Sequence, residues 1–143
     1  MAIIRIRNTR DLEEVLKVVA KNAMTKEVAE EAEETMKKKI DTEVYQTYTP
    51  VYYERTYQLR DESVEIDMID DLTLELKNTR TDGSKYIPSI IEYGKGYTWG
   101  YKRNLDEEIG PRPFGAKTHE ELKNGGFKKA LVKGLKNQGV KVV

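Results

Sequence analysis

The sequence predicts an α+β protein in which N-terminal helices pack on a small, mainly antiparallel sheet with a central β-hairpin, followed by a C-terminal helix. Three features of the apolar pattern predict this class. Apolar residues recur at helical spacing up to position 49, alternate with a period of two over 63–77, and return to helical spacing over 118–138. The 143 residues contain no cysteine, and they fit a single domain over 1–143 that needs no disulfide framework.

The N-terminal part is predicted to form two helices. An arm and a first helix fill 1–24, a second helix fills 25–49, and a break separates them. Asp11 and Glu14 resemble a capping box at the start of the first helix, and Thr25 is expected to cap the second. Each helix carries one apolar stripe, made of Leu12, Val15, Leu16, Val19 and Ala23 in the first and of Val28, Ala32, Met36, Ile40 and Val44 in the second.

The clearest strand signal lies at 63–77. Here apolar residues alternate with polar ones on both sides of Asp70-Asp71, which predicts a β-hairpin with one buried and one solvated face. The alternating apolar residues are Val64, Ile66, Met68, Leu72, Leu74 and Leu76. A second, polar turn follows, and Asp82-Gly83 is its expected tip.

The segment 94–113 is predicted to be a long loop because it holds four glycines and two prolines. A loop of this length inside a compact domain is typical of a functional segment or of one ordered by a partner. Thr118 and Glu121 fit a second capping box, which predicts a C-terminal helix over 118–138.

The charge balance and the hydropathy limit the classes of partner that this protein is expected to have. Lys and Arg number 25, Asp and Glu also number 25, and the net charge is therefore zero, whereas a nucleic-acid backbone normally calls for a surplus of cations. The N-terminus lacks the apolar core of a signal peptide, and no run approaches the ~20 apolar residues of a membrane span. We expect a soluble protein made in the cytoplasm, without a membrane partner and without specific nucleic-acid binding.

The residue types that carry catalysis are too few or too scattered to predict an enzyme. His119 is the single histidine, no cysteine can supply a thiolate, and the serines lack a nucleophile elbow. The adjacent carboxylates lie in polar segments, and Gly94-Lys95-Gly96 lacks the spacing of a phosphate loop. We therefore predict no catalytic residue, no metal and no cofactor.

Charge is distributed unevenly along the chain. Seven acidic residues and no basic one occupy 61–76, whereas seven lysines and two glutamates occupy 117–143. The candidate complementary surfaces are represented by Asp67, Asp70 and Asp71 on the hairpin and by Lys128, Lys129 and Lys133 on the C-terminal helix. Either each surface is an ordinary solvated face, or the two meet between copies of the chain in a heterologous contact that closes into a ring.

Aromatic residues gather in two segments. Residues 45–59 carry five of the nine tyrosines, including Tyr53 beside Arg55, and Trp99 alternates with two tyrosines inside 94–113. An amphipathic ring offers both a large contact area and a polar tip, so residues 45–59 form either a partner surface or a half-buried crossing between layers.

From position 50 onward the chain resembles a known family. The order of PVYYERTYQL at 50–59, Ser63-Val64 at the mouth of the hairpin, IIEYG at 90–94 and Arg-Pro-Phe at 112–114 is similar to that in bacteriophage tail-completion or head-tail joining proteins. These are the neck proteins of the gene-ten-like family of lambda-like siphophages. The resemblance covers roughly 29–135.

The resemblance implies a structural subunit that forms a homo-oligomeric ring at the neck and contacts the tail tube protein and head-completion or connector proteins. It implies assembly in the bacterial host cytoplasm, followed by residence in the virion. A head-completion or portal-adaptor protein of the same neck is the alternative within this class. A small nucleic-acid-binding module that uses the Lys-rich C-terminal helix is the alternative from another class.

Four residues of these motifs are assigned roles. Glu92, Gly94, Arg112 and Phe114 match most directly. Gly94 is expected to adopt a positive φ, Phe114 to anchor the loop in the core, and Arg112 to meet an acidic partner such as Glu92.

Overall fold

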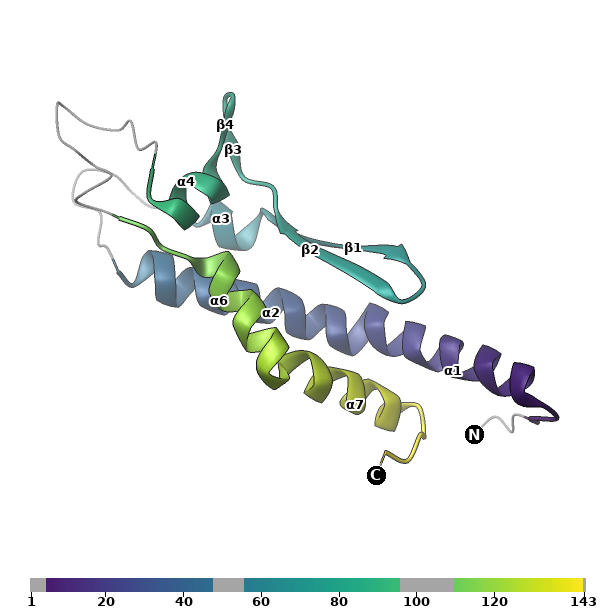
Figure 1. The fold of residues 1–143 in the computed structure, drawn as a ribbon. Coiled ribbons are helices and arrows are strands. Elements are labelled where there is room, and N and C mark those ends of the chain that lie inside the picture. The colour runs from purple at the N-terminus through teal and green to yellow at the C-terminus, as the bar shows by residue number, and fades with distance from the viewer. Residues whose placement is uncertain (1–4, 48–55, 96–109, 143) are drawn as a thin grey trace, which may run out of the picture.

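The computed structural model describes residues 5–47, 56–95 and 110–142. A long N-terminal helix forms the axis of the molecule, with the β-hairpin along one side and the C-terminal helices along the other (Figure 1). The predicted α+β class is confirmed: helices, small antiparallel sheets and a C-terminal helix packed on the N-terminal one are all present.

The N-terminal helix is continuous where the sequence predicted a break. Its four segments follow one another directly, and the residues at the joints, such as Ala23 (φ −65°, ψ −40°) and Lys39 (φ −68°, ψ −35°), keep helical dihedrals. The segments are α1 (Thr9–Ala23), the π-helical η1 (Met24–Val28), α2 (Ala29–Lys39) and the π-helical η2 (Ile40–Tyr45). The division into helices over 1–24 and 25–49 is therefore wrong.

The local chemistry explains both the continuity and the true start of this helix. The Thr25 hydroxyl donates to the carbonyl oxygens of Lys21 (2.9 Å) and Asn22 (3.1 Å), so it bonds back into the preceding turn and caps nothing. At the start, the cap is Asn8, whose side chain accepts the backbone N–H of Asp11 at 2.9 Å. The helix thus begins at Thr9, ahead of the predicted Asp11 cap.

The predicted hairpin is confirmed, although the sheet is divided. Strands β1 (Val64–Asp70) and β2 (Thr73–Asn78) pair antiparallel, with Met68 opposite Leu74 and a bulge between residues 68 and 70. A separate two-stranded sheet, β3 (Thr81–Asp82) and β4 (Lys85–Tyr86), turns at Gly83 (φ 60°). The inner face of the hairpin is half-buried, except that Leu72 at its tip is 48% exposed.

The remaining described elements are short helices and the C-terminal pair. They are α3 (Gln58–Asp61), α4 (Ile87–Tyr93), α6 (Phe114–Glu121), the π-helical η3 (Leu122–Gly126) and α7 (Phe127–Asn137). The predicted C-terminal helix over 118–138 begins too late. Thr118 lies inside α6, where its hydroxyl donates to the carbonyl oxygen of Phe114 at 2.6 Å and cannot serve as a cap. Gly125 (φ 145°) marks a kink before α7.

Two apolar clusters hold these elements together. The larger is built around the C-terminal part of the long helix and consists of Met36, Ile40, Val44, Leu59, Ile87, Ile91 and Phe114. The smaller joins η1, the hairpin and α7, and consists of Met24, Val28 and Ala130 with Met68, Leu74 and Leu131 packed against them. The first half of α1 extends beyond both clusters.

Gly134 sets how closely α7 approaches the long helix. A Cβ at this position would lie 2.6 Å from the Cβ of Ala23 and 2.7 Å from an Oε of Glu27. Around this contact, Asn137 donates to Glu27 at 3.0 Å and Gln138 donates to the carbonyl oxygen of Val19 at 2.8 Å. Two small residues thus bring the helices together, and polar side chains fix their register.

Candidate functional site

Glu92 caps a helix from a distance in sequence. Its two carboxylate oxygens accept the backbone N–H groups of Gly115 at 2.8 Å and Ala116 at 2.9 Å, in the first turn of α6. A carboxylate at this end satisfies two otherwise unpaired donors and faces the positive end of the helix dipole. The expected pairing with Arg112 is thus replaced by a capping role. Arg112 donates from Nη1 to the carbonyl oxygen of Val44 at 3.4 Å.

Gly94 and Phe114 behave as the sequence predicted. Gly94 has a φ of 68° and ends α4, and a Cβ there would lie 2.3 Å from the backbone nitrogen of Pro111. Phe114 is 2% exposed and belongs to the larger cluster. The corner formed by residues 92, 94, 112 and 114 therefore holds α4 beside the start of α6. Its described contacts are structural.

The acidic residues of the hairpin divide into two groups. Asp70 accepts the backbone N–H of Leu72 at 2.9 Å, a bond that lowers its pKa and stabilises the turn. Asp71 forms an ion pair with Lys21 of α1 at 3.0 Å. These two carboxylates therefore have partners at the tip, within their own chain.

Asp67 belongs to the solvent-facing side of the hairpin, which we call the outer face. This face includes Glu65, Asp67, Ile69, Glu75 and Lys77, with Lys77 directly opposite Glu65. Asp67 lies directly opposite Glu75 in the strand register, an arrangement that brings two like charges together and is unfavourable in an isolated hairpin. Lys77, 3.4 Å from Asp67, compensates in part, and the pKa of Lys77 is raised by this carboxylate.

The basic residues of α7 are exposed, and Lys133 borders the contact with the long helix, where its charge adds to the Asn137 hydrogen bond in lowering the pKa of Glu27. We call the surface of α7 that carries these lysines the lysine face; it consists of Lys128, Lys129, Val132, Lys133 and Lys136. The four lysines are exposed, whereas Ala130 and Gly134 on the opposite side of the helix are buried. Lys128, Lys129 and Lys133, which the sequence singled out, therefore do share one surface.

A cluster around Arg60 was not predicted. Its guanidinium donates to Asp41 at 2.6 Å and to Asp61 at 2.7 Å, and it lies 4.9 Å from the ring centroid of Tyr57 and 5.6 Å from that of Tyr45. Both carboxylates raise the pKa of Arg60. Tyr57 has a φ of 58°, which is unusual for a residue with a side chain. The cluster ties the end of the long helix to α3.

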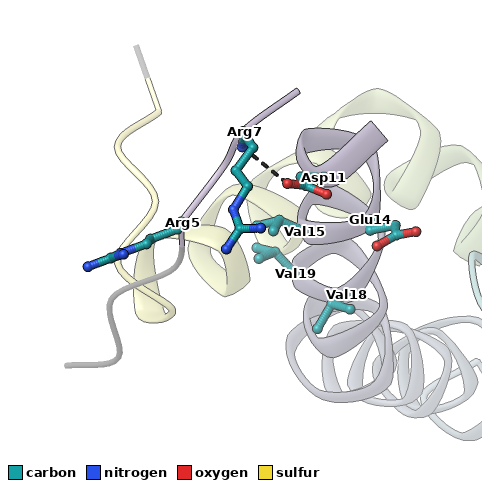
Figure 2. Close-up of a pocket in the computed structure, with 7 residues that line it drawn as sticks. All are labelled: Arg5, Arg7, Asp11, Glu14, Val15, Val18 and Val19. Atoms are coloured by element: carbon teal, nitrogen blue, oxygen red, sulfur yellow. Dashed lines mark hydrogen bonds between the residues drawn. The ribbon is translucent and has the colours of Figure 1, made fainter. Parts of the chain in front are cut away.

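The first turns of α1 border an open pocket of about 450 Å³. Figure 2 shows Arg7 reaching toward Val15 and Val19, while Arg5 points away from them. The backbone N–H of Arg7 donates to Asp11 at 3.1 Å, which holds the N-terminal arm beside the helix. The pocket thus has a partly apolar floor and a rim of mixed charge.

The remaining predictions concern three residues outside the described ranges, metal ligands and membrane spans. Tyr53, Arg55 and Trp99 lie outside the described residues. In the described ranges, no three His, Asp or Glu side chains converge as metal ligands would. No helix in those same ranges is both long enough and apolar enough to span a membrane.

The fold and the surfaces define a small α+β protein with oppositely charged outer faces. The chain belongs to the YomN family, whose pattern it matches over residues 8–137. Among curated proteins it is similar to the "SPbeta prophage-derived uncharacterized protein YomN" of Bacillus subtilis (strain 168). The two are 39% identical over 100 residues, which cover 69% of each chain. No solved structure gives a significant match.

Proposed function

We propose that this protein is a prophage-encoded structural subunit that acts at the neck of a tailed particle, in tail completion and head-tail joining. Its prophage origin is supported by the SPbeta relative. It works as a homo-oligomeric ring that meets the tail tube protein on one side and connector proteins on the other. It acts by contact, without catalysis, and passes from the host cytoplasm into the virion.

The observation that carries this proposal is the set of exposed apolar side chains at one end of the molecule. Leu12, Leu16 and Val18 of α1 are 40%, 53% and 58% exposed, and Ile69 and Leu72 of the hairpin tip are 64% and 48% exposed. Leu12 and Leu16 share one side of α1, whereas Val18 lies about 200° from Leu16 around the helix, on the side of Lys21. Large apolar residues left exposed in this number are typical of surfaces that other proteins cover. The ion pair between Lys21 and Asp71 places the hairpin tip beside α1, so that both contribute to this end.

The experiment removes the gene from an inducible prophage and examines the lysate by electron microscopy. Loss of the protein is expected to leave separate heads and tails, and purified protein added to that lysate is expected to restore joined particles. The same amount of a Leu16→Glu variant, which changes one exposed apolar residue, is expected to restore few joined particles. Normal particles in the deletion strain would refute the neck function.

One observation favours a second candidate, a small nucleic-acid-binding module. The lysine face of α7 presents four cations along one helix, as a surface that tracks phosphates would. Duplex binding at physiological salt that weakens steeply with added salt, and that Lys129→Glu with Lys133→Glu abolishes, would support this candidate. The neck proposal expects no such binding.

A further inference from the structure

The outer face of the hairpin has unfavourable electrostatics in a single chain. Asp67 and Glu75 oppose one another across the strands, and Glu65, two residues before Asp67, lies opposite Lys77. This single lysine faces three carboxylates, so the outer face keeps a negative charge. Beside these carboxylates, Ile69 is the most exposed large aliphatic side chain in the described ranges, at 64%. An apolar side chain next to acidic groups indicates a surface suited to a cationic partner with an apolar centre.

The lysine face of α7 has the complementary composition. Four lysines surround the half-buried Val132, and they project from one side of a helix whose other side is packed on α1 and η1. The two faces are of similar length: Lys129 to Lys136 spans about 10 Å at the helical rise. Glu65 to Ile69 spans about 13 Å at the rise of a strand.

These two faces do not meet within one molecule. The hairpin and α7 lie on different sides of the long helix (Figure 1). Each contributes apolar residues to the smaller cluster around η1, and the carboxylates of the one face and the lysines of the other are exposed. Among the described residues, the ion pairs of the hairpin go to Lys21 and to Lys77, and none goes to α7. The complementarity can therefore be satisfied only between molecules.

We infer that the outer face of the hairpin docks on the lysine face of α7 of a second copy of this chain. Carboxylates of residues 65, 67 and 75 meet the ammonium groups of residues 129, 133 and 136, and Ile69 packs near Val132. Because the contact joins two different surfaces, each copy keeps one face free for the next, and the assembly closes into a ring or extends as a filament. The inference rests on the proposed ring and specifies its interface.

The absence of cysteine allows a direct test by disulfide cross-linking. An Asp67→Cys variant is mixed with a Lys133→Cys variant under mild oxidation at low salt, and the mixed dimer is followed by non-reducing electrophoresis. The matched control pairs Asp82→Cys, an exposed site in the β3–β4 turn, with Lys133→Cys. We expect the first pair to form the mixed dimer about tenfold faster, because docking raises the local concentration of the two thiols. Equal rates for the two pairs would overturn the inference.

A charge exchange tests the same contact without cross-linking. Reversing the hairpin (Asp67→Lys with Glu75→Lys) or the helix (Lys129→Glu with Lys133→Glu) is expected to weaken self-association about tenfold, measured by sedimentation velocity at low salt. Both reversals in one chain, or an equal mixture of the two variants, should restore it. Loss without restoration would overturn the inference.

The tests separate the interface from the biological role. Selective cross-linking together with normal particles in the deletion strain would leave the contact standing and refute the neck function. Equal cross-linking rates for the two pairs, together with separate heads and tails in the deletion strain, would refute the contact and leave the neck function standing.

Discussion

Replacing Gly134 by alanine is expected to destabilise the protein, although alanine is the better helix former. In an ordinary helix interior this exchange stabilises by about 1 kcal/mol. Here the new Cβ would lie 2.6 Å from the Cβ of Ala23, 2.9 Å from its Cα and 2.7 Å from the carboxylate of Glu27. The Ala23 atoms cannot move without the backbone of α1, so the whole of α7 must shift.

The net effect follows from two opposing contributions. Overpacking of a tight contact costs about 1–3 kcal/mol, to which the loss of the Asn137 hydrogen bond to Glu27 adds about 1 kcal/mol. After the helix-propensity gain, we expect Gly134→Ala to lower the free energy of unfolding by about 1–3 kcal/mol. Urea denaturation followed by circular dichroism at 222 nm measures this change.

Gly126 provides the matched control. It has helical dihedrals (φ −59°, ψ −45°), and a Cβ there would approach nothing nearer than 3.3 Å. Gly126→Ala should therefore change the free energy of unfolding by no more than about 1 kcal/mol, because the helix-propensity gain offsets this milder contact. A Gly134→Ala protein as stable as wild type, or more so, would show that α7 does not pack on α1 through this glycine.

Three further predictions concern the corner and the buried carboxylate. Glu92→Ala should lower the free energy of unfolding by about 1–2 kcal/mol through loss of the α6 cap, and Glu92→Gln by less; equal losses would contradict the capping role. Gly94→Ala should lower the free energy of unfolding by about 3 kcal/mol, because strain at positive φ adds to overlap with the backbone of Pro111. Gly83→Ala is strained in the same way but has open space around the new Cβ, so it should lower the free energy of unfolding by about 1 kcal/mol. The Asn137 hydrogen bond lowers the pKa of Glu27 from its ordinary 4.5, so its contribution to stability is present above pH 4.5 and is lost as the pH falls through the folded-state pKa. As the pH is lowered below 4.5, Asn137→Ala should lose less of its free energy of unfolding than wild type. An equal loss in both proteins would show that this hydrogen bond does not set the pKa of Glu27.

The hairpin could be predicted because its signal is local. Alternation with a period of two assigns residues to opposite faces wherever a strand packs on one side, so the acidic outer face follows from Glu65, Asp67 and Glu75 alone. Gly94 was predictable for a similar reason, since a glycine after an apolar element commonly ends it with a positive φ. Both features depend on neighbours in sequence.

The wrong predictions share a different cause. Thr25 and Thr118 have the sequence context of caps, yet each hydroxyl donates to a carbonyl of the preceding turn inside a helix. A threonine serves either role, and the choice depends on whether the flanking residues are held in a helix by packing. The helix continues through Thr25 because Ala23, Met24 and Val28 are buried together.

The sequence by itself determined the α+β class, the two-faced hairpin and the opposite charges of the hairpin and the C-terminal segment, because periodicity and charge are properties of short stretches. Only the tertiary structure decided that Glu92 caps α6, that Gly134 meets Ala23, and that Arg60 joins two tyrosines and two aspartates. Apart from those of Arg60 with Asp61 and Tyr57, these contacts link residues far apart in the chain, and their geometry depends on how whole helices pack. The same packing turns the two charged faces outward, where only another molecule can reach them.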